Sequence, residues 1–243
     1  TYDDFSEDDS LKILKNFQDK IDIVFLGNKK LNHVSRNFIY LLEFSLNKFG
    51  RNNIYYFCDQ DDIWDEKKVA ITNKLLLESN SPLLLSGVKH FGNKNTVLIP
   101  NINRFFILDL FFNVAPGMSY AFVPSRLNKD ISLIKLFKWH DHGLFLISRI
   151  FGPAPLVSTK VLQYYRRHGN SYMSINKFNF SNRFSYFWSN LNALIKIFFR
   201  WSTIIRNDFL EIRLIIIFFW EILIMSGYFN NTINIIEDEL KQN

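Results

Sequence analysis

Residues 54–64, Ile-Tyr-Tyr-Phe-Cys-Asp-Gln-Asp-Asp-Ile-Trp, decide the fold of this chain. An apolar run, Ile54–Cys58, predicts a buried strand, and the carboxylates of Asp59, Asp61 and Asp62 follow it directly. Acidic groups this close repel one another, so a strand end tolerates them where water, a cation or basic groups neutralise them. Magnesium and manganese favour such oxygen ligands and usually complete their shell with substrate phosphates. The stretch therefore indicates a nucleotide or diphosphate site, with a solvated acidic turn as the simpler alternative.

The composition is that of a globular protein with an excess of positive charge. The 243 residues are 48% hydrophobic and 21% charged, which allows a substantial core and excludes wholesale disorder. The net charge of +6 suits an anionic substrate or an anionic membrane surface. Nucleic acid is the weaker partner, because the basic residues are sparse and no recognised nucleic-acid motif accompanies them.

Cysteine usage and the first residues predict a cytoplasmic location. Cys58 is the only cysteine, so the chain forms no intrachain disulfide and needs no oxidising compartment. Its first residues carry neither the basic region nor the apolar region of a secretory signal.

Alternating helices and short apolar strands predict an α/β sandwich with a mixed, mainly parallel sheet. Periodicity indicates helices over residues 11–17, 34–49 and 67–77, and strands over 21–26, 54–58, 83–88 and 118–123. In such sheets ligands gather at the carboxyl ends of the strands, which is where the acidic stretch lies. We expect this domain to occupy residues 1–173.

Residues 174–243 form a second region with a different character, and we expect a helical tail there. Between residues 177 and 206 every charged residue is positive, and aromatic residues are interleaved with them. This composition favours a membrane surface. Residues 214–225 are nearly all apolar but include Glu221, and they are too few for the ~20 residues of a spanning helix. Binding to a membrane or a partner and packing on the domain are equally compatible with the pattern.

Two further groups of residues carry chemistry. His140 and Asp141 precede an apolar helical run, so Asp141 is either a helix cap or a reactive acid. Arg166, Arg167 and His168 follow a strand; two arginines could neutralise a diphosphate and His168 could bind a metal or a phosphate. The alternative for this second group is a basic surface strand.

The order of these motifs resembles the inverting glycosyltransferases of family 2, which have the GT-A fold, and particularly the bacterial rhamnosyltransferase-like members that build surface polysaccharides such as O-antigen. The resemblance covers roughly residues 3–172. Asp3-Asp4-Phe5-Ser6 is similar to the family's DDGS segment, with Phe5 in place of a glycine, where it disfavours a positive φ. DQDDIW at residues 59–64 is unchanged, residues 113–119 resemble the NxxxGxx loop, and residues 165–170 match the YRxHGN strand.

The resemblance implies a role for each of these positions. Asp141 would be the general base; Asp3, Asp4 and Asp59 would bind the nucleotide; Asp61 and His168 would bind Mn²⁺ or Mg²⁺; Arg166 and Arg167 would bind the diphosphate; and Asp62, Trp64, Asn113, Gly117 and His140 would form the pocket for acceptor and donor sugar. One carboxylate can accept the acceptor's proton while metal and arginine stabilise the leaving diphosphate.

The implied activity is transfer of a sugar, rhamnose by resemblance, from a dTDP- or UDP-linked donor to a lipid-linked saccharide at the inner face of the plasma membrane. The chain begins at the DDGS-like segment, so we expect it to lack the first strand and helix of the fold. Two alternatives remain: a truncated, noncatalytic remnant or partner subunit of such an enzyme, and a metal-dependent phosphohydrolase using the same aspartates.

Overall fold

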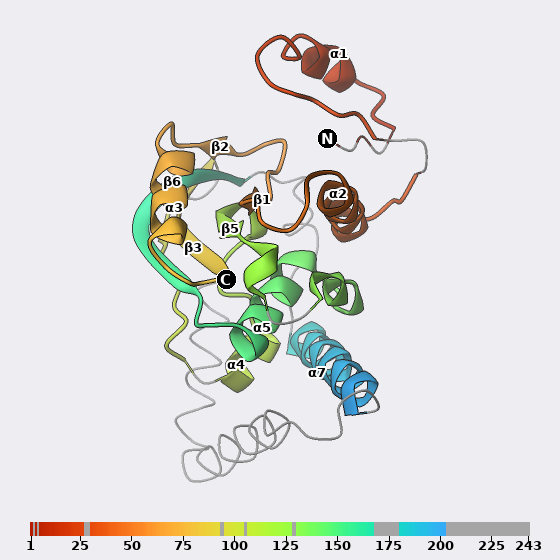
Figure 1. The fold of residues 1–243 in the computed structure, drawn as a ribbon, viewed down its shortest axis with the longest axis vertical. Coiled ribbons are helices and arrows are strands. Elements are labelled where there is room, and N and C mark those ends of the chain that lie inside the picture. The colour runs from red at the N-terminus through yellow and green to blue at the C-terminus, as the bar shows by residue number, and fades with distance from the viewer. Residues whose placement is uncertain are drawn as a thin grey trace.

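A computed structural model describes residues 1, 3, 5–26, 30–92, 95–104, 106–127, 130–167 and 180–202 (Figure 1). The helices are α1 (Ser10–Lys15), α2 (Val34–Phe49), α3 (Lys68–Leu77), α4 (Phe106–Phe111), α5 (His140–Phe151) and α7 (Phe180–Ser202), with 3₁₀ turns η1 (Gly117–Ser119), η2 (Pro124–Arg126) and η3 (Ile131–Leu136). The strands are β1 (Tyr55–Tyr56), β2 (Ile63–Trp64), β3 (Leu83–Gly92), β4 (Val97–Leu98), β5 (Tyr120–Phe122) and β6 (Leu156–Arg167).

The described strands form one mixed sheet in the order β1-β5-β3-β6-β2, with β4 beside β3. The predicted α/β architecture is confirmed, but parallel pairing is confined to β3–β6 and the other four ladders are antiparallel. The predicted predominance of parallel pairing is therefore not found among these strands. Connection length explains both cases: β4 follows β3 after a few residues and must return antiparallel, whereas β6 reaches β3 through the long crossover that parallel pairing requires.

Helices cover both faces of the long central strand β3. Leu83 and Leu85 lie in a core with Leu144 and Phe145 of α5, whereas Leu84 points the other way, to Leu76 of α3. Consecutive side chains of a strand face opposite sides of the sheet, so a strand buried on both faces is apolar at every position. This explains why residues 83–85 read as an uninterrupted apolar run.

Several predicted elements match the structure and others differ, including the strand predicted over 54–58, which is only Tyr55–Tyr56. The helix predicted over 34–49 is α2, and the strand predicted over 83–88 continues to Gly92. The run 21–26 is extended, but its only bridging residue is Leu26, which accepts from the Asp3 N–H and donates to the Thr1 carbonyl. Ile21 is 60% exposed, so little burial drives this run into the sheet. The strand predicted over 118–123 begins as the 3₁₀ turn η1 and is shorter.

The described part of the tail, α7, packs against α4 beside α5 (Figure 1). Phe187, Ala193 and Ile197 belong to the main core, and Asn190 donates to the Leu110 carbonyl. Within residues 180–202, one face of the helix therefore packs on the domain. The predicted boundary at residues 173–174 and the apolar run 214–225 lie outside the described residues. Within the described ranges, no helix has the length and apolarity needed to cross a membrane.

Phe5 adopts a positive φ of +64°, the backbone conformation for which a glycine is suited. The ring is half exposed, so burial contributes little to holding it there. A left-handed conformation costs a residue with a side chain about 1–2 kcal/mol. The turn is closed by Asp3, whose Oδ2 accepts from the Ser6 N–H at 3.0 Å. Phe5 thus takes the positive φ that its side chain disfavours, at the cost of local strain.

Candidate functional site

The acidic turn between β1 and β2 runs across one end of the sheet. Because β1 and β2 lie at opposite edges, the connecting residues 57–62 must pass the intervening strands. Two contacts fasten the turn to β6: the Arg166 N–H donates to Asp62 Oδ1 at 3.0 Å, and Arg166 Nε donates to the Asp61 carbonyl at 3.1 Å. The predicted placement of the carboxylates at a strand end is therefore found.

The carboxylates of this turn are poorly neutralised. Burial, followed by the charges of Asp62, Asp141 and Asp61, raises the pKa of Asp59 to about 7. Burial is also the main cause that raises the pKa of Asp62 to about 6. Asp62 Oδ2 is buried and accepts no hydrogen bond from the described residues. At both groups, burial and the neighbouring carboxylates outweigh the opposing charge of Lys68, and a bound cation would relieve this condition.

Lys68, which the sequence analysis did not single out, is a buried basic residue beside the acidic turn. Its side chain is buried, Nζ donates to the Met118 carbonyl at 2.5 Å, and Nζ lies 3.9 Å from the centroid of the Trp64 ring. Burial lowers the pKa of Lys68 to about 7, opposed by the charges of Cys58, Asp62 and Asp59. Helical spacing could have identified it, because residue 68 shares the buried face of α3 with Thr72 and Leu76, whereas Lys67 is exposed.

Trp64 and Arg166 support the turn in the structure. The Trp64 ring packs beside Tyr56, with centroids 5.5 Å apart, and beneath Lys68. Arg166 makes the two contacts to the turn and lies 5.1 Å from the Phe91 ring, while Arg167 lies 5.0 Å from the Tyr165 ring. The predicted roles of Trp64 in a sugar pocket and of both arginines on a diphosphate stay predictions.

Asp141 lies in the first turn of α5, where both of its oxygens accept hydrogen bonds. Oδ1 accepts from the His142 N–H at 2.8 Å, and Oδ2 accepts from Asn113 Nδ2 at 2.9 Å. The charge of Asp141 is also one of the causes that raise the pKa of Asp59. The acid at the start of α5 and the acid after β1 therefore border one site.

His140 and Gly117 lie beside this acid. A methyl group added at Gly117 would approach Asp141 Cβ to 3.0 Å and His140 Nε2 to 3.3 Å, so the loop packs directly on the start of α5. The His140 ring is 6% exposed, stacks on Phe38 and makes no hydrogen bond to the described residues. Burial lowers the pKa of His140 to about 4, which keeps the imidazole neutral at pH 7.

The remaining predicted residues are not joined to this site. Asp3 lies in the N-terminal turn beside Leu26, and no described hydrogen bond or ion pair links it to the acidic turn. Asp4 and His168 lie outside the described residues. The structure therefore brings together Asp59, Asp61, Asp62, Asn113, Gly117, His140 and Asp141.

A metal at this site would rely on few protein ligands. Among the residues the structure describes, no three His, Cys, Asp or Glu side chains form a group arranged to hold a metal ion. The turn nevertheless fits a cation, because Asp59 and Asp62 have raised pKa values and Asp62 Oδ2 is buried without a partner. Mg²⁺ is commonly held by one or two carboxylates together with substrate phosphates. The donor set fits this arrangement.

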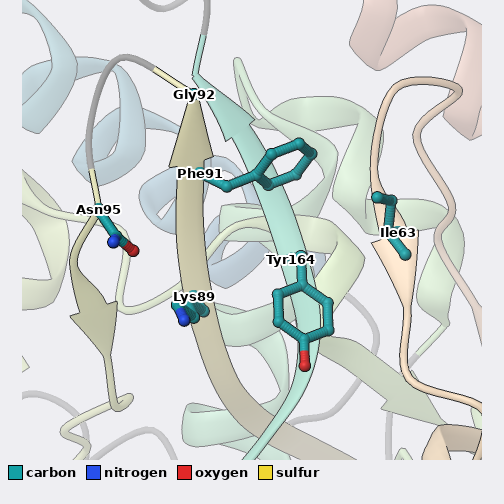
Figure 2. Close-up of a pocket in the computed structure, with 6 residues that line it drawn as sticks. All are labelled: Ile63, Lys89, Phe91, Gly92, Asn95 and Tyr164. Atoms are coloured by element: carbon teal, nitrogen blue, oxygen red, sulfur yellow. The ribbon is translucent and has the colours of Figure 1, made fainter.

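An open groove of about 510 Å³ lies on the sheet beside β2 (Figure 2). It is lined by Ile63, Lys89, Phe91, Gly92, Asn95 and Tyr164. Figure 2 shows the Phe91 and Tyr164 rings on neighbouring strands, β3 and β6, with Ile63 across from them on β2. Ile63 and Trp64 are consecutive in a strand and face opposite sides of the sheet. The groove therefore lies on the opposite face of the sheet from the Trp64 ring. No carboxylate is among the residues that line it.

The arrangement of sheet, helices and acidic turn is a GT-A glycosyltransferase fold. The solved structures that define it here are of S. aureus TarS, residues 1–349. The complex with UDP-GlcNAc has a TM-score of 0.52 at 14% identity and covers 71% of this chain and 50% of TarS 1–349. The structures without a named ligand and with UDP have TM-scores of 0.51 and 0.50 at 13% and 12% identity, each covering 79% of this chain and 60% of that one.

At these identities the comparison establishes the fold. The chain spans between half and three fifths of the TarS chains that it matches. No protein-family model and no curated protein sequence matches it.

Proposed function

We propose that this chain is an inverting, metal-dependent glycosyltransferase that moves a sugar from a nucleoside-diphosphate donor to a cell-surface polysaccharide precursor. One observation carries the proposal: the oriented carboxylate of Asp141 and the under-neutralised acidic turn border the same site. The GT-A fold shared with TarS, whose structures contain UDP-GlcNAc and UDP, supports a nucleotide-linked donor.

The two acidic groups have separate tasks in this reaction. Asp141 accepts the proton of an acceptor hydroxyl as its oxygen attacks the anomeric carbon, and the bond from that carbon to the diphosphate breaks on the opposite face. The nucleoside diphosphate leaves with the bonding electrons. Asp61, with Asp59 beside it, would hold Mn²⁺ or Mg²⁺, which when bound supplies positive charge to the diphosphate. His140, neutral and buried, bounds the pocket without adding charge.

The proposed identities of the donor sugar and the acceptor rest mainly on the sequence motifs. The resemblance to rhamnosyltransferase-like enzymes favours dTDP-rhamnose as donor, and UDP in the TarS structures favours a UDP-linked hexose. The acceptor that we propose is a lipid-linked saccharide at the cytoplasmic leaflet, with Asn113 and Gly117 on the acceptor side.

Nucleotide binding should depend on a divalent cation and on Asp61. With MnCl₂ present and UDP or dTDP at about 100 times its Kd, binding should add about 2.7 kcal/mol to the free energy of unfolding. EDTA or Asp61→Asn should remove most of this gain, because the diphosphate then meets unneutralised carboxylates. Thermal unfolding with and without each nucleotide measures it.

Glu66→Gln is the matched control, because it removes an exposed carboxylate from the neighbouring connection between β2 and α3. If neither nucleotide stabilises the wild-type chain with manganese, or if Asp61→Asn and Glu66→Gln behave alike, the proposed function is wrong. Release of inorganic phosphate without transfer of a sugar would indicate a phosphohydrolase instead.

We also propose that the outer face of α7 attaches the protein to the cytoplasmic leaflet. Phe184, Trp188 and Ile195 are 42%, 60% and 43% exposed and share this face, near the exposed Lys196. An exposed aromatic stripe with basic residues suits an anionic interface. The opposite face of α7 is buried in the domain core.

Trp188→Ser should weaken binding to anionic lipid vesicles by about tenfold, because burial of a large apolar side chain contributes roughly 1.5–3 kcal/mol. Cosedimentation with phosphatidylserine-containing vesicles measures this. Phe49→Ser is the control, since Phe49 is 54% exposed at the end of α2. Equal sedimentation of both variants and the wild type would contradict the proposal. Point substitutions are preferable to deleting the tail, because deletion would remove core residues such as Phe187.

A further inference from the structure

A chain of two hydrogen bonds runs from the centre of the sheet to Asp141. The Tyr120 hydroxyl of β5 donates to Asn113 Oδ1 at 3.0 Å, and Asn113 Nδ2 donates to Asp141 Oδ2 at 2.9 Å. Tyr120 has no exposed surface and Asn113 is partly buried in the loop after α4. Asn113 and Tyr120 are 7 residues apart, and Asn113 meets Asp141, the acid in the first turn of α5, across 28 residues.

The chemistry of each group fixes the direction of this chain. A carboxylate only accepts hydrogen bonds, so Asn113 must turn its NH₂ group toward Asp141. The amide oxygen then faces Tyr120, whose hydroxyl donates to it. The reverse orientation would place the amide oxygen against the carboxylate oxygen. Tyr120 therefore locks the amide in the one orientation that supports Asp141.

We propose that Asn113 and Tyr120 are positioning residues that hold the Asp141 carboxylate in the orientation needed to accept the acceptor's proton. This inference rests on the proposed function and reassigns Asn113, which the sequence motif places in the sugar pocket. Asn113 is the side chain, among the described residues, that hydrogen-bonds to Asp141.

The other groups around Asp141 do not supply such a bond. Asp59, His140, Tyr120 and Tyr186 interact with it electrostatically. Asp59 repels the carboxylate, and His140 is neutral at pH 7 because burial lowers its pKa. The backbone N–H of His142 holds Oδ1, which leaves Asn113 to fix the second oxygen and with it the plane of the carboxylate. Each oxygen retains a lone pair for an incoming hydroxyl.

A general base acts only when it lies within hydrogen-bond reach of the proton, and a misplacement of about 1 Å can cost 10²-fold in rate. Loss of the Asn113 amide should therefore appear in kcat. The donor contacts lie on the acidic turn, so the donor's KM should change little. This division distinguishes a positioning residue from a residue that binds the donor.

The test compares Asn113→Ala and Tyr120→Phe with wild type, with release of UDP or dTDP as the readout. The donor is whichever of UDP-GlcNAc, UDP-glucose, UDP-galactose and dTDP-rhamnose the wild-type chain consumes with manganese. We expect kcat to fall about 10–100-fold for Asn113→Ala and less for Tyr120→Phe, with the donor KM within about twofold. Tyr120→Phe removes one hydroxyl and conserves the shape of the core.

Asn73→Ala is the matched control. Asn73 accepts from the Tyr56 hydroxyl at 2.6 Å in an equivalent tyrosine–asparagine pair on α3. It should retain the wild-type kcat. If Asn113→Ala and Asn73→Ala lower kcat and the melting temperature equally, or if Asn113→Ala raises a KM and leaves kcat unchanged, the inference is overturned. Failure of the wild-type chain to bind or consume any donor would instead overturn the proposed function.

Discussion

Asp141→Asn is expected to lower kcat by about 10²–10⁴-fold, the range over which a positioned general base contributes to catalysis. The substitution keeps the size of the side chain and an oxygen for the His142 N–H, so α5 should still begin at the same residue. The amide cannot take the acceptor's proton, however. Donor affinity should be nearly unchanged, because the acidic turn that would bind the diphosphate is intact. Steady-state release of UDP or dTDP, together with calorimetric binding of the donor, measures both quantities.

Glu78→Gln is the control for this change. It removes an exposed carboxylate whose only described ion pair is the surface contact with Lys74 at 3.8 Å, and exposed pairs of this kind contribute about 0–1 kcal/mol. Its kcat should equal that of wild type. If Asp141→Asn retains full activity while Asp59→Asn or Asp62→Asn abolishes it, the base lies in the acidic turn and the division of tasks proposed above is wrong.

Local patterns predicted the parts of the site that one segment determines. The run of apolar residues before Asp59 is a signal contained within a few residues, and the structure places the carboxylates after β1 as expected. The same holds for Asp141, since helix periodicity begins directly after it and α5 starts at His140. Val34–Phe49 carries one apolar face and forms the predicted helix.

Contacts between distant segments could not be predicted in this way. Asn113 and Asp141 are 28 residues apart, and nothing in either segment indicates that their side chains meet. Lys68 carried a weak local signal, its place on the buried face of α3, but its contact with Met118 depends on how η1 approaches that helix. The contact of Arg166 with the acidic turn could not be predicted for the same reason, because its position on β6 brings it to the carbonyl of Asp61.

The helix α7 is the largest element for which the sequence did not decide between packing on the domain and binding to a membrane or a partner. A helix on a membrane and a helix on a protein core have the same amphipathic periodicity, so only the structure shows which face of the helix is buried. Polar groups show that one face of α7 packs on the domain. The Asn190 amide donates to the Leu110 carbonyl, the Tyr186 hydroxyl contacts His142 Nδ1, and Arg183 lies 4.7 Å from the Phe112 ring. These contacts tie α7 to α4 and the residue after it and, through His142, to the helix that carries Asp141.

His142 is the centre of that connection, and its chemistry makes the fold sensitive to acid. The ring is fully buried; Nε2 donates to the Asp109 carbonyl, and Nδ1 accepts from the Tyr186 hydroxyl. The neutral ring makes both contacts, whereas a proton on Nδ1 would reverse the contact with the Tyr186 hydroxyl and place a charge on a fully buried side chain. Burial lowers the pKa of His142 to about 3, and the same cause lowers the pKa of His140 to about 4.

The free energy of unfolding should therefore decrease as the pH falls below about 6.5, the ordinary pKa of histidine. Between that pH and the folded-state pKa, the unfolded chain binds a proton on His142 that the folded chain does not bind, so stability rises with pH in this window. At about 1.4 kcal/mol per pKa unit, His142 alone accounts for a loss of about 2 kcal/mol at pH 5 relative to pH 7.5. Guanidinium unfolding at the two pH values, followed by circular dichroism, measures the difference.

His142→Asn should reduce this pH dependence while lowering stability at both values, because the variant loses the hydrogen bonds but has no proton to gain. His33→Gln is the matched control: the ring is only partly buried at the start of α2, so its removal should leave most of the dependence in place. Equal losses between pH 7.5 and pH 5 in wild type and His142→Asn would contradict the assignment. The His142 ring lies on α5, the helix that carries the proposed base, and contacts Tyr186 of α7, so its protonation would weaken one of the contacts between these two helices.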